Sequence, residues 1–175
     1  TFDESSDDLF KVQLEIAESI AKLLTNEITP ESLKKLVQDK PNNTEAYEYY
    51  LKGLYYHSEY WNNAQDEDFI RSEKMFQKSI ELDNGFASAF ADLADLYDTR
   101  SNSGDSYKWL ALRDSLAEIS FLINRNSPIV SHIKGNTFLR SPKPNYDRAF
   151  FYFRKTIDLE SGYAPYIYTM SAFYD

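Results

Sequence analysis

The sequence contains no cysteine, which excludes disulfide frameworks, zinc–thiolate sites and cysteine nucleophiles. A chain without disulfides suits both the cytoplasm and the periplasm, so we expect a cytoplasmic protein and keep the periplasm as the alternative. No apolar run approaches the roughly 18 residues of a membrane-spanning helix, and no basic and then apolar leader opens the chain. The sequence therefore predicts no membrane span.

Positive charge is scarce, with 19 Lys and Arg against 28 Asp and Glu, a net charge of −9 and an isoelectric point near 4.8. This balance argues against binding to the phosphate backbone of nucleic acids and to anionic membrane surfaces. A charged partner should therefore be basic.

Histidine is also rare, with two residues in the chain. His57 and Glu59 could be considered as metal ligands, but a spacing of two residues places them on different faces of a helix. No third ligand is near them in the sequence, and there is no Ser/His/Asp arrangement or glycine-rich phosphate loop. We therefore expect no metal, no cofactor and no catalytic site in this chain.

Aromatic residues are abundant, with 14 Tyr and 12 Phe in 175 residues, and 42% of the chain is hydrophobic. That composition is sufficient for a buried core in one domain or in a few helix pairs. No strand pattern with its turn signals is present, so the fold class predicted is all-α.

One stretch occurs twice. Residues 76–98, FQKSIELDNGFASAFADLADLYD, match residues 153–175, FRKTIDLESGYAPYIYTMSAFYD, at a constant offset of 77 residues. In each copy a helical pattern ends before a glycine, Gly85 or Gly162, and a second helical pattern follows. Glycine reaches positive φ without a steric penalty, so we expect a tight turn there. The unit is predicted to be a helix, a turn and a helix.

Apolar residues at helical spacing predict a series of helices along the chain. Residues 1–40 are predicted to form a two-helix lead-in, which ends at the breaker cluster of residues 39–43. The first pair of helices is separated by a long connector, residues 57–68, whose aromatics Tyr60 and Trp61 we expect to be exposed and to pack over the end of the array. The other predicted loops are residues 99–106 and 141–145. A last helix, residues 163–174, has no partner.

The helix pairs resemble tetratricopeptide repeats, in which an aromatic, a small residue and a tyrosine recur on the first helix. The small residue recurs as Gly53, Ala94, Gly135 and Ser171, at spacings of 41, 41 and 36 residues. The resemblance implies a right-handed α-α superhelix of about three and a half units, at residues 44–85, 86–127, 128–162 and 163–175. The extra residues are expected between the helices of a pair. Several second-helix positions depart from the pattern: Ser72, Asn84, Arg113, Ala117, Arg125 and Ser161.

Residues 8–17, DLFKVQLEIA, carry a second resemblance, together with residues 45–47 (EAY) and 50–53 (YLKG). They look like the segment that follows the TolB-like amino-terminal domain of bacterial signalling proteins. Full-length chains of that group often carry a nucleotide cyclase or a DNA-binding winged helix upstream. None of those catalytic or DNA-reading residues is in this sequence, so we interpret it as a non-enzymatic piece of a longer chain.

The repeat resemblance also implies a concave face lined by the first helix of each pair. Its groove positions in this chain are Tyr47, Tyr50, Leu54, His57, Ser88, Ala91, Asp95, Asp98, His132, Asn136, Leu139, Arg140 and Tyr168. They predict an aromatic end, an acidic middle and a mixed far end; the alternative is that they are ordinary solvated or stacking residues. One subset of the family binds carboxylate tails through Lys and Asn, but His132 and Asp95 stand where those residues would be needed.

The predicted function is a protein-interaction scaffold of a bacterial signalling protein, with a basic or aromatic peptide or protein in its groove. The first alternative is a self-association module that forms a homodimer through the uncapped face of the last helix. The second alternative is the non-catalytic part of a nucleotide cyclase.

Overall fold

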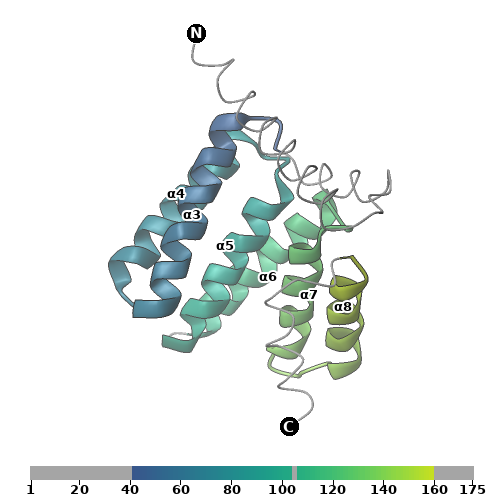
Figure 1. The fold of residues 1–175 in the computed structure, drawn as a ribbon. Helices are drawn as coiled ribbons and strands as arrows, with labels where there is room; N and C mark the ends of the chain where they lie inside the picture. Colours follow the sequence, from purple (N-terminus) through teal and green to yellow (C-terminus); the bar gives the residue numbers. More distant parts are fainter. Residues whose placement is uncertain (1–40, 104–105, 160–175) are drawn as a thin grey trace, which may run out of the picture. The chain divides into compact units, whose positions relative to one another are not determined.

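The computed structural model describes residues 41–103 and 106–159 (Figure 1). The chain divides into two units between Lys40 and Pro41, and all described residues belong to the second. They form α-helices and one short 3-10 helix, with no strand among them, which confirms the all-α class. The predicted lead-in helices, the last helix and Gly162 lie outside the described residues.

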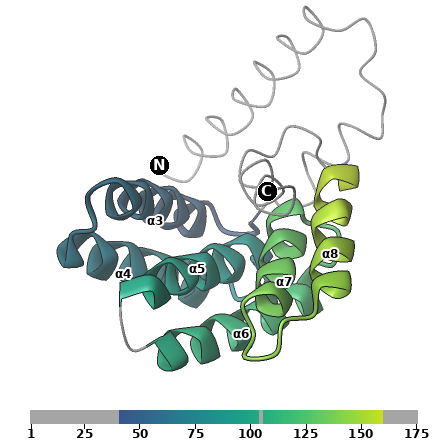
Figure 2. The ribbon, with the colours of Figure 1, turned by 90° about the horizontal axis from the view of Figure 1, so that it is seen from below.

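The helices pack as three successive pairs (Figures 1 and 2). The most extensive contacts are α3 with α4, α5 with α6, and α7 with α8, and each pair then contacts the next through α4–α5 and α6–α7. The bounds are α3 Thr44–Asn63, α4 Asp66–Leu82, α5 Ala87–Arg100, η1 Ser101–Ser103, α6 Ser106–Ile123, α7 Pro128–Leu139 and α8 Tyr146–Leu159. The predicted loop before α8 is confirmed. Before α6, α5 continues to Arg100 and is followed by η1, and residues 104–105 lie outside the described residues.

The predicted long connector in the first pair is wrong. The helix α3 continues to Asn63 and α4 begins at Asp66, so the turn consists of Ala64 and Gln65. Ala64 has φ of 53°, and its amide donates to the carbonyl of Tyr60 at 2.8 Å. Because this left-handed position usually holds glycine, the sequence gives no turn signal there.

The burial of Tyr60 also corrects the prediction. Its side chain is only 3% exposed and its ring lies edge-on to Phe69, with 5.5 Å between centroids. The adjacent Trp61 is 70% exposed, as the sequence predicted. About two turns of helix in place of a loop put these two adjacent side chains on different faces.

The turn between α4 and α5 does not depend on a left-handed glycine, because the φ of Gly85 lies outside that range. Instead Asp83 closes the turn: its Oδ1 accepts from the Gly85 amide at 3.0 Å and its Oδ2 from the Asn42 amide at 2.6 Å. The expectation that Gly85 supplies positive φ is therefore wrong, and a buried carboxylate holds the turn.

Two glycines allow the helices of a pair to approach closely. A Cβ on Gly53 would lie 2.6 Å from the ring of Phe76 on α4, and a Cβ on Gly135 would clash with the ring of Phe153 on α8. The corresponding residues of the middle pair, at the same spacing, are Ala94 and Ala117, both fully buried. A larger residue on one helix is thus matched by a smaller residue on its partner.

The helix α5 is surrounded by its neighbours, since it contacts α3, α4, α6 and α7. Of its 14 residues, 11 are buried: Ala87, Ser88, Ala89, Phe90, Ala91, Asp92, Leu93, Ala94, Leu96, Tyr97 and Asp98. Four of them are alanines, which permit close packing on several sides. Two buried aspartates on this helix need internal partners, which positions the polar cluster described below.

The glycine contacts give a direct prediction. Gly135→Ala should destabilise the unit by about 1–3 kcal/mol through overpacking against Phe153, and Phe153→Ala by about 3–5 kcal/mol through the cavity it leaves. The double variant, which restores the alanine pair of the middle unit, should lose less than the sum of the two. Urea denaturation of all four proteins measures this coupling, and strict additivity would contradict the proposed contact.

Candidate functional site

Five residues that the sequence assigned to the groove lie together between α5 and α7. Asp95 and Asp98 belong to α5, His132 and Asn136 to α7, and Arg140 follows α7 directly. Asp98, His132 and Asn136 are buried, whereas Asp95 and Arg140 are half-buried. The structure therefore brings the acidic middle and the mixed end of the predicted groove into one mostly buried cluster.

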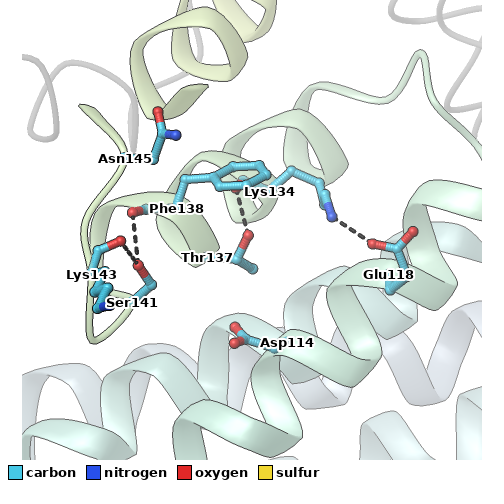
Figure 3. A pocket seen from close by; sticks show the side chains of 8 residues that line it. All are labelled: Asp114, Glu118, Lys134, Thr137, Phe138, Ser141, Lys143 and Asn145. Atoms are coloured by element: carbon cyan, nitrogen blue, oxygen red, sulfur yellow. Dashed lines mark hydrogen bonds and ion pairs between the residues drawn. The ribbon is translucent and has the colours of Figure 1, made fainter. Parts of the chain in front are cut away.

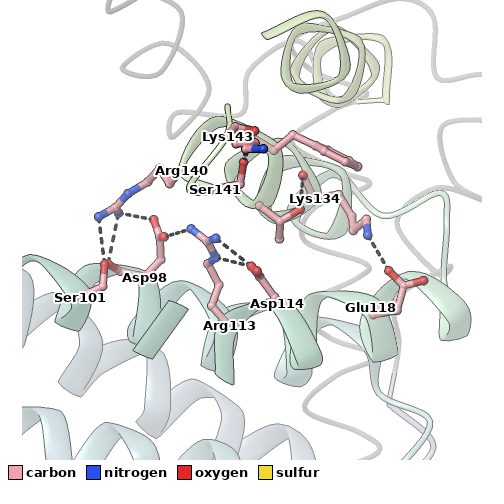
Figure 4. A network of polar contacts seen from close by, with 11 residues as sticks. Asp98, Ser101, Arg113, Asp114, Glu118, Lys134, Arg140, Ser141 and Lys143 are labelled. Carbon is pink, nitrogen blue, oxygen red and sulfur yellow. Dashed lines mark hydrogen bonds and ion pairs between the residues drawn. The ribbon is translucent and has the colours of Figure 1, made fainter. Parts of the chain in front are cut away.

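Asp98 is the centre of this cluster and binds two arginines (Figure 4). Its Oδ1 accepts from Nη1 of Arg113 at 2.6 Å, and its Oδ2 accepts from Nη1 of Arg140 at 2.6 Å. Arg113, on α6, has no exposed surface, and Arg140 also donates to Ser101 Oγ at 2.9 Å. The carboxylate therefore joins α5, α6 and the end of α7.

Arg113 was not predicted as a site residue. The repeat pattern has alanine at its position, and the departure was the one sequence signal available. Besides Asp98, it contacts its neighbour Asp114, to which Nε donates at 2.9 Å. A buried guanidinium must have charged or polar partners, and these two carboxylates provide them.

Asp95 and His132 influence each other's ionisation across the α5–α7 contact. Burial raises the pKa of Asp95 to about 6; the nearby Asp98 adds to the rise, while His132 and Arg140 oppose it. Burial lowers the pKa of His132, and the two aspartates oppose that change. Asn136 Nδ2 lies 3.4 Å from His132 Nε2, and the imidazole packs at 5.6 Å from the ring of Phe153.

The first pair contacts the second through polar side chains that have a constant separation in the sequence. Tyr50 on α3 donates to Asp92 Oδ2 at 2.8 Å, and His57 Nε2 lies 3.4 Å from Thr99 Oγ1. Each of these pairs is separated by 42 residues, as is the Asp98–Arg140 pair. Neighbouring first helices are thus linked by equivalent side-chain bonds.

The aromatic end of the predicted groove keeps accessible surface. Tyr47, Tyr50 and Leu54 on α3 are all half-buried. The rings of Tyr47 and Tyr50 stack with 6.0 Å between centroids, and Tyr50 also meets Phe86 edge-on at 4.8 Å. This arrangement offers a fixed apolar surface with polar tips, which suits contact with a peptide. Ser88 and Ala91 are buried, Leu139 is half-buried, and Tyr168 lies outside the described residues.

His57 is buried, with 9% of its surface exposed, and burial lowers its pKa to about 4. Its imidazole packs edge-on to Phe76 and lies beside Thr99. Within residues 41–103 and 106–159 there is no group of three His, Cys, Asp or Glu side chains able to hold a metal ion. We assign His57 a packing role between α3, α4 and α5.

A cavity of about 420 Å³ opens beside the polar cluster, between α6, α7 and the loop before α8 (Figure 3). Asp114 and Glu118 line it from α6, and the α7 side chains lie opposite. Its lining residues are Asp114, Glu118, Lys134, Thr137, Phe138, Ser141, Lys143 and Asn145. This cavity is not visible in the sequence, because an isolated charged residue on a helix pattern resembles an ordinary solvated one.

No protein-family model matches the chain, and a search of curated proteins finds no match. None of the helices described in residues 41–103 and 106–159 is both long and apolar enough to cross a membrane.

The buried arginine makes Asp98 sensitive to substitution. Asp98→Asn should lower the free energy of unfolding by about 3–5 kcal/mol, because it leaves the buried Arg113 guanidinium with the half-exposed Asp114 as its one remaining charged partner in the described residues. Asp66→Asn is the matched control: Asp66 is 70% exposed where it pairs with Arg100, so its loss should change stability far less. Urea denaturation at neutral pH compares them, and equal losses would contradict the buried network.

His57 predicts a pH dependence of stability. The unfolded chain binds a proton at His57 near its ordinary pKa of 6.5, but the folded chain binds it only near 4. Stability is therefore lost as the pH falls from about 6.5 to 4, by about 2 kcal/mol between pH 7 and pH 5.

Asp95 acts in the opposite sense, since its raised pKa favours the folded state as the pH falls from about 6 to 4. The comparison must therefore be made between variants. His57→Gln should remove the His57 contribution, so that its stability falls less than that of the parent between pH 7 and pH 5. Denaturation at both pH values measures the difference, with Glu59→Gln as control. Parallel losses in parent and His57→Gln would show that the imidazole is not kept neutral.

Proposed function

We propose that this unit is a protein-interaction scaffold of the tetratricopeptide type. The observation that carries the proposal is the recurrence of one packing position in three successive helix pairs: Gly53 with Phe76, Ala94 with Ala117, and Gly135 with Phe153. A repeated small residue on the first helix, matched to a residue on the second, is typical of stacked helical repeats. Such arrays act by presenting an extended surface to a partner.

The aromatic end of the groove, formed by Tyr47, Tyr50 and Leu54, is the binding surface that the proposal favours. These residues retain exposed surface, whereas Asp98, His132 and Asn136 are buried and hydrogen-bonded internally. Tyrosines give large contact area at low cost in side-chain entropy, which makes them effective binding residues. The net charge of −9 favours a partner that is basic as well as aromatic or apolar.

The biological setting rests on the sequence resemblance of residues 8–17, 45–47 and 50–53. On that resemblance we propose that the unit is a regulatory region of a bacterial signalling protein and contains no catalytic residues of its own, with the cytoplasm as the expected compartment. A parent chain with a nucleotide cyclase domain fits the same resemblance.

Self-association is the second candidate, and a specific observation favours it. The helix α8, which is the last described element, exposes three aromatic residues: Tyr146 at 61%, Phe150 at 41% and Phe151 at 62%. An exposed aromatic face of this kind is an interaction surface. Under this candidate the partner is a second copy of the chain.

Selection of peptides from a random library on the 175-residue chain tests the groove. A selected peptide should lose about tenfold in affinity, or about 1.4 kcal/mol, with Tyr47→Ala or Leu54→Ala. Tyr107→Ala is the matched control, since Tyr107 is a tyrosine on α6 that is 79% exposed. The result against the proposal is a set of selected peptides whose affinity changes equally with Tyr47→Ala and Tyr107→Ala.

Sedimentation equilibrium distinguishes the second candidate. If α8 forms a homodimer, Phe151→Ser should shift the chain toward monomer, while Tyr107→Ser should not. A monomer at every accessible concentration would remove self-association from consideration.

A further inference from the structure

The α6–α7 contact contains a cavity, whereas the equivalent α4–α5 contact is filled by side chains of the protein. In the α4–α5 contact, Leu93, Leu96 and Tyr97 of α5 pack in one apolar cluster with Phe69 and Phe76 of α4. The hydroxyl of Tyr97 also donates to Glu73 Oε1 on α4 at 2.6 Å. This contact is closed by side chains of the protein itself.

The three residues of α7 at the same positions, 41 residues later, are Lys134, Thr137 and Phe138. All three line the cavity of about 420 Å³. A lysine and a threonine in place of two leucines leave space that the protein does not fill. The volume lies within the range of pockets that hold small ligands or single side chains.

The positions of Glu73 and Gln77 on α4 are likewise taken by Asp114 and Glu118 on α6. These carboxylates are four residues apart, so they lie side by side on one face of the helix (Figure 3). The Asp114 side chain is 49% exposed and that of Glu118 57%, whereas Lys134, bound to Glu118 Oε2 at 2.6 Å, is 11% exposed. The α6 wall of the cavity therefore carries two carboxylates, and Lys134 and Lys143 line the rest of it.

One oxygen of each carboxylate remains available. Asp114 uses Oδ1 for Arg113, and Glu118 uses Oε2 for Lys134. Within the described part of the chain, Asp114 Oδ2 and Glu118 Oε1 make no hydrogen bond or ion pair. Carboxylate oxygens already held on one side by buried cations are pre-oriented acceptors for a further donor.

Phe138 provides the apolar wall opposite. Its ring stacks on Tyr152 of α8, with 5.6 Å between centroids and an interplanar angle of 11°, which fixes its orientation. Along α6, Leu122 lies one turn beyond Glu118 and is 65% exposed, beside Ile119 at 41%. These two apolar side chains are three residues apart, so they lie on one face of α6 beyond the acidic pair.

We propose that the α6–α7 cavity binds an arginine side chain of a peptide whose adjacent residues are apolar. The planar guanidinium can donate to Asp114 Oδ2 and Glu118 Oε1 together, which the single point charge of lysine does less well. Its aliphatic stem lies against Phe138 and Thr137, and the adjacent apolar residues contact Ile119 and Leu122. This cavity shares no residue with the aromatic end of the groove formed by Tyr47, Tyr50 and Leu54, so the two proposals can fail independently.

The test uses blocked peptides of the form acetyl-Gly-Arg-Leu-Leu-amide on the full 175-residue chain, followed by backbone NMR shifts. Shifts should appear at residues 114–122 and 134–138, at high micromolar to millimolar peptide. The same peptide with citrulline, which has the shape of arginine without its charge, should give none. A glutamate peptide of the same length tests the opposite assignment, in which Lys143 at the rim binds an anion.

Three variants give the sign of the effect. Glu118→Gln should weaken binding of the arginine peptide about threefold, as expected for loss of one partly exposed ion pair. Lys143→Gln should strengthen binding slightly by removing a repelling charge. Glu81→Gln is the matched control, because Glu81 is an exposed glutamate paired with Lys78 at 3.0 Å on α4 and should change nothing.

Three results would overturn the proposal: equal binding of the arginine and citrulline peptides, binding of the glutamate peptide that Lys143→Gln abolishes, or no shifts with any peptide. A loss of binding with Tyr47→Ala instead of Glu118→Gln would place the arginine in the groove and leave the interaction function intact.

Discussion

The burial of α5, in which 11 of 14 residues are buried, is the constraint on which the described unit depends. A helix enclosed by four others cannot leave a charge on any face without a partner. Asp92 is therefore bound by Tyr50 of the preceding pair, and Asp98 by Arg113 of its own pair and Arg140 of the next. These bonds join α5 to α3, to α6 and to Arg140, which follows the last residue of α7. The burial of α5 therefore accounts for the polar contacts between the pairs.

Packing within each pair follows a second rule, that of complementary size. Where the first helix has glycine, the second presents a phenylalanine ring, and where the first has alanine, the second has alanine. Between pairs, the α6–α7 contact is not filled in this complementary way. Lys134 and Thr137 stand there at the positions that Leu93 and Leu96 occupy in the α4–α5 contact. The proposed arginine site lies there because the chain does not close that contact with its own side chains.

Much of the fold could be predicted from the sequence, because helical spacing, the breaker at residues 141–145 and the proline that begins α7 are local signals. The turn at Ala64 could not, since a left-handed alanine is selected by the surrounding packing and not by its own preference. The residues of the predicted groove were assigned by their position in the sequence. Their burial depends on contacts between residues 42 positions apart, which no local pattern contains. Arg113 was visible only as a departure from the repeat, and its meaning required the position of Asp98.

Native-state hydrogen exchange tests the role of α5 most directly, because it reports the local opening free energy of each helix. The account predicts that the amides near the centre of α5, from Ala91 to Leu96, exchange most slowly of all described residues and only through global unfolding. Amides at the outer ends of α3 and α8 should exchange sooner, through local opening. Exchange of α5 that is faster than that of α3 or α8 would contradict the account, because α5 would then not be the element that holds the pairs together.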